Sequence, residues 1–165
     1  MADREELLRN EDVAWRSFVS EVGRVPEHVR SVEGVVPGWS VNDLVYHVGK
    51  WAEVGGRKLE LIKEGRETRE DDDFEDSNAV WAAESKSLSY EQAMSSALEA
   101  RERARSVLSG FDQVDHEVES WFKEETTDHY LEHAQEVSRF ADSLGPGDAG
   151  YLGQSPGEPG PGSSN

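Results

Sequence analysis

Four segments of the 165-residue chain repeat apolar residues every three to four positions, which is the spacing of one face of an α-helix. They run from about residue 4 to 23, from 40 to 65, from 89 to 109, and from about 119–123 to 144. The chain shows no strand-like alternation, no βαβ rhythm and no internal repeat. The pattern therefore predicts an all-α fold, a four-helix bundle with one long crossover connection.

Residues that start helices stand where the second and third segments begin. Ser40 is followed three residues later by Asp43, and Ser89 by Gln92. A hydroxyl followed at this distance by an acid or amide is the capping-box pattern, in which each side chain satisfies a backbone N–H of the first turn. We therefore expect helices to begin directly after both serines.

The remaining segments are interpreted as connections and a tail. The charged run 66–75, with aspartates at 71–73, predicts a solvated crossover loop, and a short helix is expected around 78–84. After the Gly-Pro stop signal at 145, glycine, proline and serine dominate. The sequence thus predicts a helical domain over residues 1–144 and a disordered tail over 145–165.

The helix faces indicate which residues form the core. The first helix is expected to bury Leu8, Trp15, Val19 and Val22, with Phe18 at the edge of this face. Asp12 also falls on this face, either as a solvated edge residue, which we favour, or as an acid facing an internal site. The predicted inner face of the third helix is made of small residues, which either admit a close neighbour or leave a pocket: Ala93, Ala97, Ala100, Ala104 and Leu108.

Charge and composition narrow the possible functions. The chain has 35 acidic and 17 basic residues, a formal net charge of -18, so it repels phosphate backbones and anionic membranes. It has no cysteine, its first residues lack the apolar core of a signal peptide, and no stretch has the length of a membrane span. We expect a cytoplasmic protein with a small-molecule substrate and with neither nucleic acid nor membrane as partner.

Two histidines of the last helix, His129 and His133, lie four residues apart. Their Cβ atoms are then about 5–6 Å apart on one face, so both imidazoles can reach one ion at about 2.0–2.1 Å. Apolar neighbours on that face indicate that the pair points inward: Phe122, Thr126, Val137, Phe140 and Leu144. Buried imidazoles need partners, so the pair shares either a hydrogen-bond network or a metal ion, and spacing does not choose between them.

A third ligand has to come from another helix, and His47 is the best candidate. It lies one turn after Leu44 and one turn before Trp51, at the edge of the apolar face of the second helix. An edge position suits a ligand that reaches across to a neighbour, and it equally suits a half-exposed histidine. Trp51 and Trp39 are interpreted as packing residues.

Four other residues are of types that could take part in such a site. His28 and His116 fall in loop or terminal regions and are interpreted as incidental. Glu132 and Glu136 flank the histidine pair, where either could orient an imidazole or act as a base near a bound water. A solvated helix edge is the simpler interpretation of both acids.

Two segments resemble a known family. The stretch from Pro37 to Trp51, PGWSVNDLVYHVGKW, is similar to the loop and second helix of the DinB superfamily, where a Gly-Trp-Ser segment opens a helix that presents a metal-binding histidine. The stretch from Asp128 to His133, DHYLEH, resembles the fourth-helix motif that supplies two further ligands. The resemblance covers about residues 4–144.

Carried over position by position, the resemblance implies that His47, His129 and His133 bind one divalent metal ion, which could be zinc, nickel, iron or manganese. Relatives include thiol-dependent S-transferases and maleylpyruvate isomerase, which use bacillithiol or mycothiol. Three neutral imidazoles leave the ion its charge and an open position, where a thiol or water is more easily deprotonated. The resemblance thus implies a thiol S-transferase or related detoxification enzyme that acts on small electrophiles, with a low-molecular-weight thiol as co-substrate.

Two alternatives stand beside this hypothesis. Water at the open position would make the protein a metal-dependent hydrolase, and a closed site would make it a non-catalytic stress-response or binding protein with a structural metal. The isomerases usually carry a further C-terminal domain, whereas only the glycine- and proline-rich segment follows here, which argues against the isomerase reaction. The sequence is compatible with a dimer but does not require one.

Overall fold

The computed structural model describes residues 2–69 and 74–145. Every regular element in these residues is helical, which confirms the predicted all-α class. The helices are α1 (Arg4–Arg24), the 3-10 turn η1 (Glu27–Val29), α2 (Val41–Lys63), α3 (Phe74–Ser85), α4 (Tyr90–Ser109), α5 (His116–Phe122), the π-helical segment η2 (Lys123–Asp128) and α6 (His129–Ser143). The aspartate run at 71–73 and the predicted tail beyond residue 145 lie outside the described residues.

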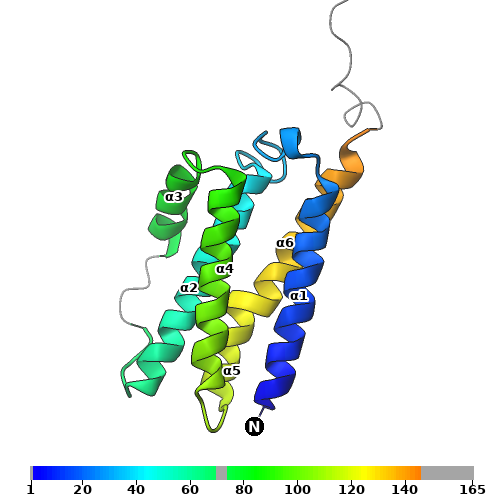
Figure 1. The fold of residues 1–165 in the computed structure, drawn as a ribbon. Coiled ribbons are helices and arrows are strands. Elements are labelled where there is room, and N and C mark those ends of the chain that lie inside the picture. Colours follow the sequence, from blue (N-terminus) through cyan, green and yellow to red (C-terminus); the bar gives the residue numbers. More distant parts are fainter. Residues whose placement is uncertain (1, 70–73, 146–165) are drawn as a thin grey trace, which may run out of the picture.

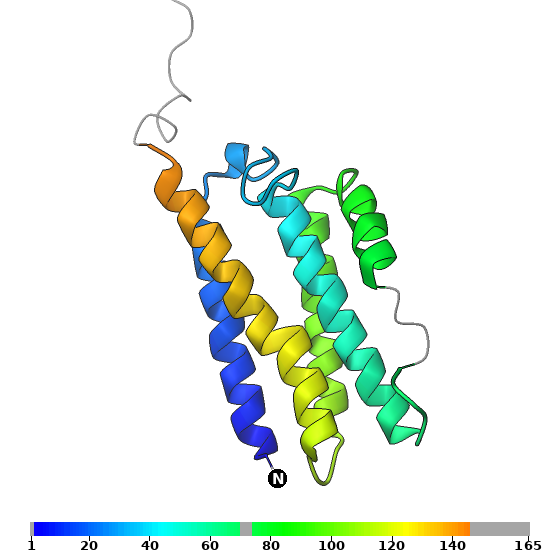
Figure 2. The same cartoon turned by 180° about the vertical axis from the view of Figure 1, so that it is seen from behind.

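The long helices pack in two pairs, α1 with α6 and α2 with α4 (Figure 1). The last helical stretch, α5–η2–α6, leans across the molecule: its first part lies against α2 and its second part against α1 (Figure 2). Helix α3 packs mainly against α2, on the side away from α1. Helix α2 therefore contacts every element that surrounds the candidate site.

Both predicted capping boxes are present. The Ser40 hydroxyl accepts from the Asp43 amide while the Asp43 carboxylate accepts from the Ser40 amide, and Ser89 and Gln92 make the same exchange. These bonds satisfy amides that the first helical turn leaves without partners. They set the starting residues of α2 and α4, and with them the register of His47.

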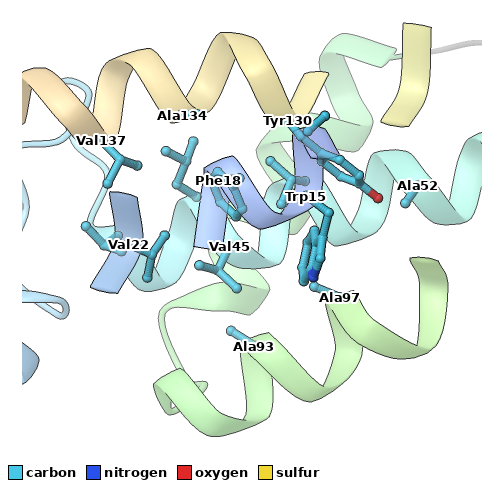
Figure 3. Close-up of a cluster of buried hydrophobic side chains, with 14 of the residues drawn as sticks. Trp15, Phe18, Val22, Val45, Ala52, Ala93, Ala97, Tyr130, Ala134 and Val137 are labelled. Carbon is cyan, nitrogen blue, oxygen red and sulfur yellow. The ribbon is translucent and has the colours of Figure 1, made fainter. Parts of the chain in front are cut away.

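The core between the two helix pairs is made of aromatic and aliphatic side chains that meet near the middle of the molecule (Figure 3). Trp15 meets Tyr130 edge-on, with ring centroids 5.2 Å apart, and Phe18 lies 6.4 Å from the same tyrosine. A second cluster fills the end near the N-terminus, around Leu59, Leu108 and Phe122. The two clusters hold the helices on both sides of the segment that carries the histidines.

The small residues of α4 admit a close neighbour. A Cβ added at Gly49 would lie 2.7 Å from the Cα of Ala97, and one at Gly56 would lie 3.3 Å from the Cα of Ala104. Helices α2 and α4 therefore touch backbone to backbone along two turns. Of the two roles that the sequence allowed for these alanines, a close neighbour or a pocket, the structure shows the close neighbour.

The predicted inner face of α1 is confirmed at Trp15 and Val22 and is off by one residue at Leu8 and Val19. Leu7 and Phe18 are buried, whereas Leu8 and Val19 are only half-buried. The cause is Glu11, which is fully buried on this face because two arginines of α4 pair with it. Because Glu11 interrupts the apolar residues of this face, the sequence pattern alone assigns the wrong neighbouring residues to it.

The last helix also differs from its prediction. It starts at His116, several residues before the expected start, and its middle turn is π-helical. Asp115 caps it by accepting from the Val118 amide. The π segment places three successive residues, 125 to 127, in buried positions, a pattern that no α-helical period predicts.

None of the helices in the described part of the chain is both long and apolar enough to cross a membrane.

Candidate metal centre

Three histidines meet between α2 and α6. His47 lies in the second turn of α2, His129 is the first residue of α6, and His133 follows one turn later. One ring nitrogen from each lies within 4.8 Å of the others, and the Nε2 atoms of His47 and His129 are 3.1 Å apart. His47 and His133 are buried, and His129 is half-buried. We call these three residues the histidine triad.

The donor set and its spacing fit a divalent metal ion. At metal–nitrogen distances of about 2.0–2.1 Å, tetrahedral geometry separates two ligand nitrogens by about 3.3 Å, close to the 3.1 Å between His47 and His129. The Nδ1 atom of His47 is buried without a hydrogen-bond partner. It is Nε2 of His47, and not Nδ1, that faces His129, so a cation bound between the two helices would take Nε2 of His47 as one of its three imidazole donors.

The surroundings keep His47 and His129 uncharged. Burial, followed by the proximity of His133 and His129, lowers the pKa of His47 from 6.5 to about 2. Burial and then His133 lower the pKa of His129 from 6.5 to about 3, against a hydrogen bond to the Glu124 backbone that raises it. Both imidazoles are therefore neutral at pH 7 and have lone pairs to offer a metal.

Two neighbouring groups orient the imidazoles of the last helix. His133 Nδ1 lies 2.5 Å from Glu136 Oε2, and because a carboxylate only accepts, this nitrogen carries the proton. His129, the first residue after the π segment, is hydrogen-bonded to the backbone of Glu124, which lies within that segment. Partners of this kind fix the ring orientation and tautomer of metal-binding histidines.

Aromatic rings enclose the triad. The Trp39 ring centroid is 4.7 Å from that of His47, and the Trp51 ring centroid is 5.5 Å from that of His129. Trp51 donates from Nε1 to Asn78 Oδ1 of α3 at 3.2 Å. Trp39 and Trp51 therefore pack as predicted, Trp51 among the buried hydrophobic residues and Trp39 against the core cluster, and both also contact histidines of the site.

A polar network joins α3 to the start of α2. Asp43 accepts from Ser85 Oγ and Lys86 Nζ, each at 2.7 Å, in addition to its capping bond. Burial alone would raise the pKa of Asp43, but the bonds from Lys86, the Ser40 backbone and Ser85 together hold it below its usual value of 3.8. This ionised carboxylate keeps the end of α3 beside the turn that presents His47.

The other sequence candidates lie away from this centre. His28 is exposed in η1 and His116 is exposed at the start of α5. Glu132 is exposed, whereas Glu136 contacts the triad directly. From the sequence the two acids are equal candidates. Glu136 differs in that it follows His133 by three residues and so lies on the same side of α6.

The chain matches the model of one family, the mycothiol maleylpyruvate isomerase N-terminal domain, over residues 8–130. This is a DinB-like all-helical family, and the match spans more than half of the chain, so the protein belongs to it. The matched stretch includes His47 and His129 and ends three residues before His133. Comparisons with curated proteins and with solved structures gave no significant match.

Proposed function

We propose that this protein is a metal-dependent enzyme that transfers a low-molecular-weight thiol to a small electrophile. The observation that carries the proposal is the convergence of three imidazoles, with ligand nitrogens within 4.8 Å of one another. Membership of a family named after a mycothiol-dependent isomerase supports the thiol. Zinc, nickel, iron and manganese all suit the donor set.

The fold assignment belongs to the same proposal. We infer that α1, α2, α4 and the α5–η2–α6 stretch form a DinB-like four-helix bundle, with the connection from α2 to α4 as its long crossover. The pairing of α1 with α6 and of α2 with α4 supports this. On this proposal residues 1–144 form one domain, in a cytoplasmic protein that takes a small molecule and neither nucleic acid nor membrane.

In this proposal each residue of the site has a role. His47, His129 and His133 hold the ion, and Glu136 keeps the Nδ1 proton on His133 so that Nε2 faces the centre. A divalent ion held there would lower the pKa of a thiol at its open position and make a thiolate available at neutral pH. Trp39 and Trp51 cover part of the triad through ring contacts with His47 and His129.

A metal-dependent hydrolase is the nearest alternative, with water in place of the thiol. That reaction needs a base near the open position. The acid closest to this role, Glu136, is bound to His133 Nδ1, which favours the thiol reaction. A non-catalytic protein with a structural metal would show metal binding without turnover.

Turnover by the metal-loaded protein tests the proposal. Purified protein is supplied with each candidate metal and assayed for loss of mycothiol, bacillithiol or cysteine in the presence of a panel of electrophiles. We expect metal- and thiol-dependent turnover that disappears in His133→Ala and persists in His28→Ala, a matched variant of an exposed histidine. Equal rates in both variants, or electrophile hydrolysis without thiol consumption, would contradict it.

A further inference from the structure

Three tryptophans from separate elements form a series of rings in which His47 stands between the first two, with ring centroids 4.7 Å from Trp39 to His47 and 6.3 Å from His47 to Trp51. Trp39 comes from the loop before α2, Trp51 from α2 and Trp81 from α3. Trp51 lies 5.5 Å from His129 on one side and 5.5 Å, edge-on, from Trp81 on the other. The series therefore extends from the triad across α2 to α3.

The outer members of this series are open to solvent. Trp51 is 8% exposed, but Trp39, Trp81 and His129 are all half-buried. Trp15 of the core, in contrast, is 6% exposed and packed among other core side chains. Large apolar rings left partly in water next to a reactive centre are a favourable surface for another flat apolar group.

The charged groups around these rings disfavour an anion. Glu136 contacts His133. Glu84 accepts a hydrogen bond at 2.8 Å from the hydroxyl of Tyr46, which lies one turn before Lys50 on α2. The Lys50 Nζ atom is 5.7 Å from the Trp81 ring centroid, but it is also 2.5 Å from a Glu53 carboxylate oxygen, which offsets its charge. An anionic ligand would also meet the overall negative charge of the chain.

We propose that Trp39, Trp51 and Trp81 bind a planar, uncharged aromatic or conjugated group of the electrophile and hold it beside the triad. The hydrogen bond from Trp51 to Asn78 fixes the ring that lies between His129 and Trp81. The inference deepens the proposed function and rests on it only in taking the triad as the reacting centre. It assigns the substrate class: neutral and flat, in place of a small dicarboxylate.

Two fluorescent probes with the same aromatic framework test the substrate class. N-phenyl-1-naphthylamine is uncharged, and 1-anilinonaphthalene-8-sulfonate adds one negative charge. Both are titrated into the full-length protein after removal of metal with a chelator. We expect the uncharged probe to bind about tenfold more tightly, and Trp39→Ala and Trp81→Ala each to weaken its binding about tenfold.

Val80→Ala is the matched control, because Val80 is an exposed apolar residue next to Trp81 on the same helix. It should leave the affinity unchanged, and Trp81→Phe should recover most of it. The inference is overturned if the sulfonate binds as tightly as the neutral probe, if both tryptophan variants bind normally, or if Val80→Ala loses as much affinity as Trp81→Ala. Circular dichroism melting confirms that each variant is folded.

The outcomes separate this inference from the proposed function. Probe binding is measured without metal, so it does not depend on catalysis. Tryptophan-dependent binding of the neutral probe without any metal-dependent turnover would leave the aromatic surface standing and remove the proposed function. Turnover of flat electrophiles at the wild-type rate in both Trp39→Ala and Trp81→Ala would leave the proposed function standing and remove the aromatic surface.

Discussion

Two of the buried polar clusters in the described residues differ in how completely their atoms are paired. Between α1 and α4, both carboxylate oxygens of Glu11 accept hydrogen bonds from Arg101 and Arg105, a group that we call the ion cluster. Arg101 also binds Asp12, whose pKa it lowers. Between α2 and α6, the histidine triad places nitrogens face to face and leaves His47 Nδ1 without a partner.

This difference separates a structural role from a functional one. A buried charge that is fully paired holds two helices together and has nothing left to offer a ligand. The triad, in contrast, keeps one buried nitrogen unpaired, His47 Nδ1, at a cost in stability, and points ring nitrogens at one another where a ligand that binds them would stabilise the folded chain. The ion cluster is therefore expected to govern stability, and the triad to govern metal binding.

The largest expected effect is on the ion cluster. Glu11→Ala leaves Arg101 and Arg105 half-buried without their carboxylate, so we expect the free energy of unfolding to fall by about 3–4 kcal/mol. Urea unfolding measures it, with Glu99→Ala, which removes an exposed acid of α4, as the control. A change below about 1 kcal/mol would mean that the cluster contributes no more than a surface pair does.

The next effect is the pH dependence of the metal-free protein. His47 and His129 take up protons near pH 6.5 when unfolded but only near pH 2 and 3 when folded. Below pH 6.5 the unfolded state therefore binds more protons, and stability falls as the pH falls. From pH 6.5 to 5 we expect a loss of about 2–3 kcal/mol, most of which disappears in His47→Leu/His129→Leu. An unchanged slope in that double variant would contradict the assignment.

Glu136 tests the orientation of the triad. Glu136→Gln keeps a weaker acceptor for His133 Nδ1 but removes the charge, so we expect metal affinity to fall about 10–100-fold with little change in stability. Competition with a metal-binding dye measures it. Glu132→Gln removes an exposed acid from the same helix and should bind metal normally; equal losses in both variants would indicate a general effect of charge.

The smallest effect has the opposite sign to the first. His47→Leu removes the unpartnered Nδ1 atom from the interior, so the metal-free protein should gain about 1 kcal/mol of stability. The same variant should lose metal binding. Thermal melting in chelator shows whether the gain occurs, and a clear loss of stability would place His47 among the structural residues.

The parts of the fold that were predictable depend on local chemistry. Ser40 with Asp43, and Ser89 with Gln92, form the capping boxes that their spacing predicts. The inward side of the last helix was also predictable, because His133 and Val137 share an apolar face and both are buried. In each case the information lies within a few residues of sequence.

The remaining features depend on contacts between distant residues. Glu11 is buried because arginines some ninety positions later reach it, and this moved the predicted face of α1. The π segment before His129 leaves no local pattern. His47 was ambiguous by periodicity and was singled out by the family resemblance; its position opposite His129 is set by the packing of α2 against the last helix.

Metal content of the purified protein tests the central claim most directly. The claim is that His47, His129 and His133 together hold one divalent ion. Elemental analysis compares the unmodified protein with His133→Ala and with His116→Ala, which replaces an exposed histidine at the start of α5. It should find about one ion per chain in the unmodified protein and in His116→Ala, and almost none in His133→Ala. Equal metal content in all three proteins, or no metal in any after incubation with the candidate ions, would contradict it.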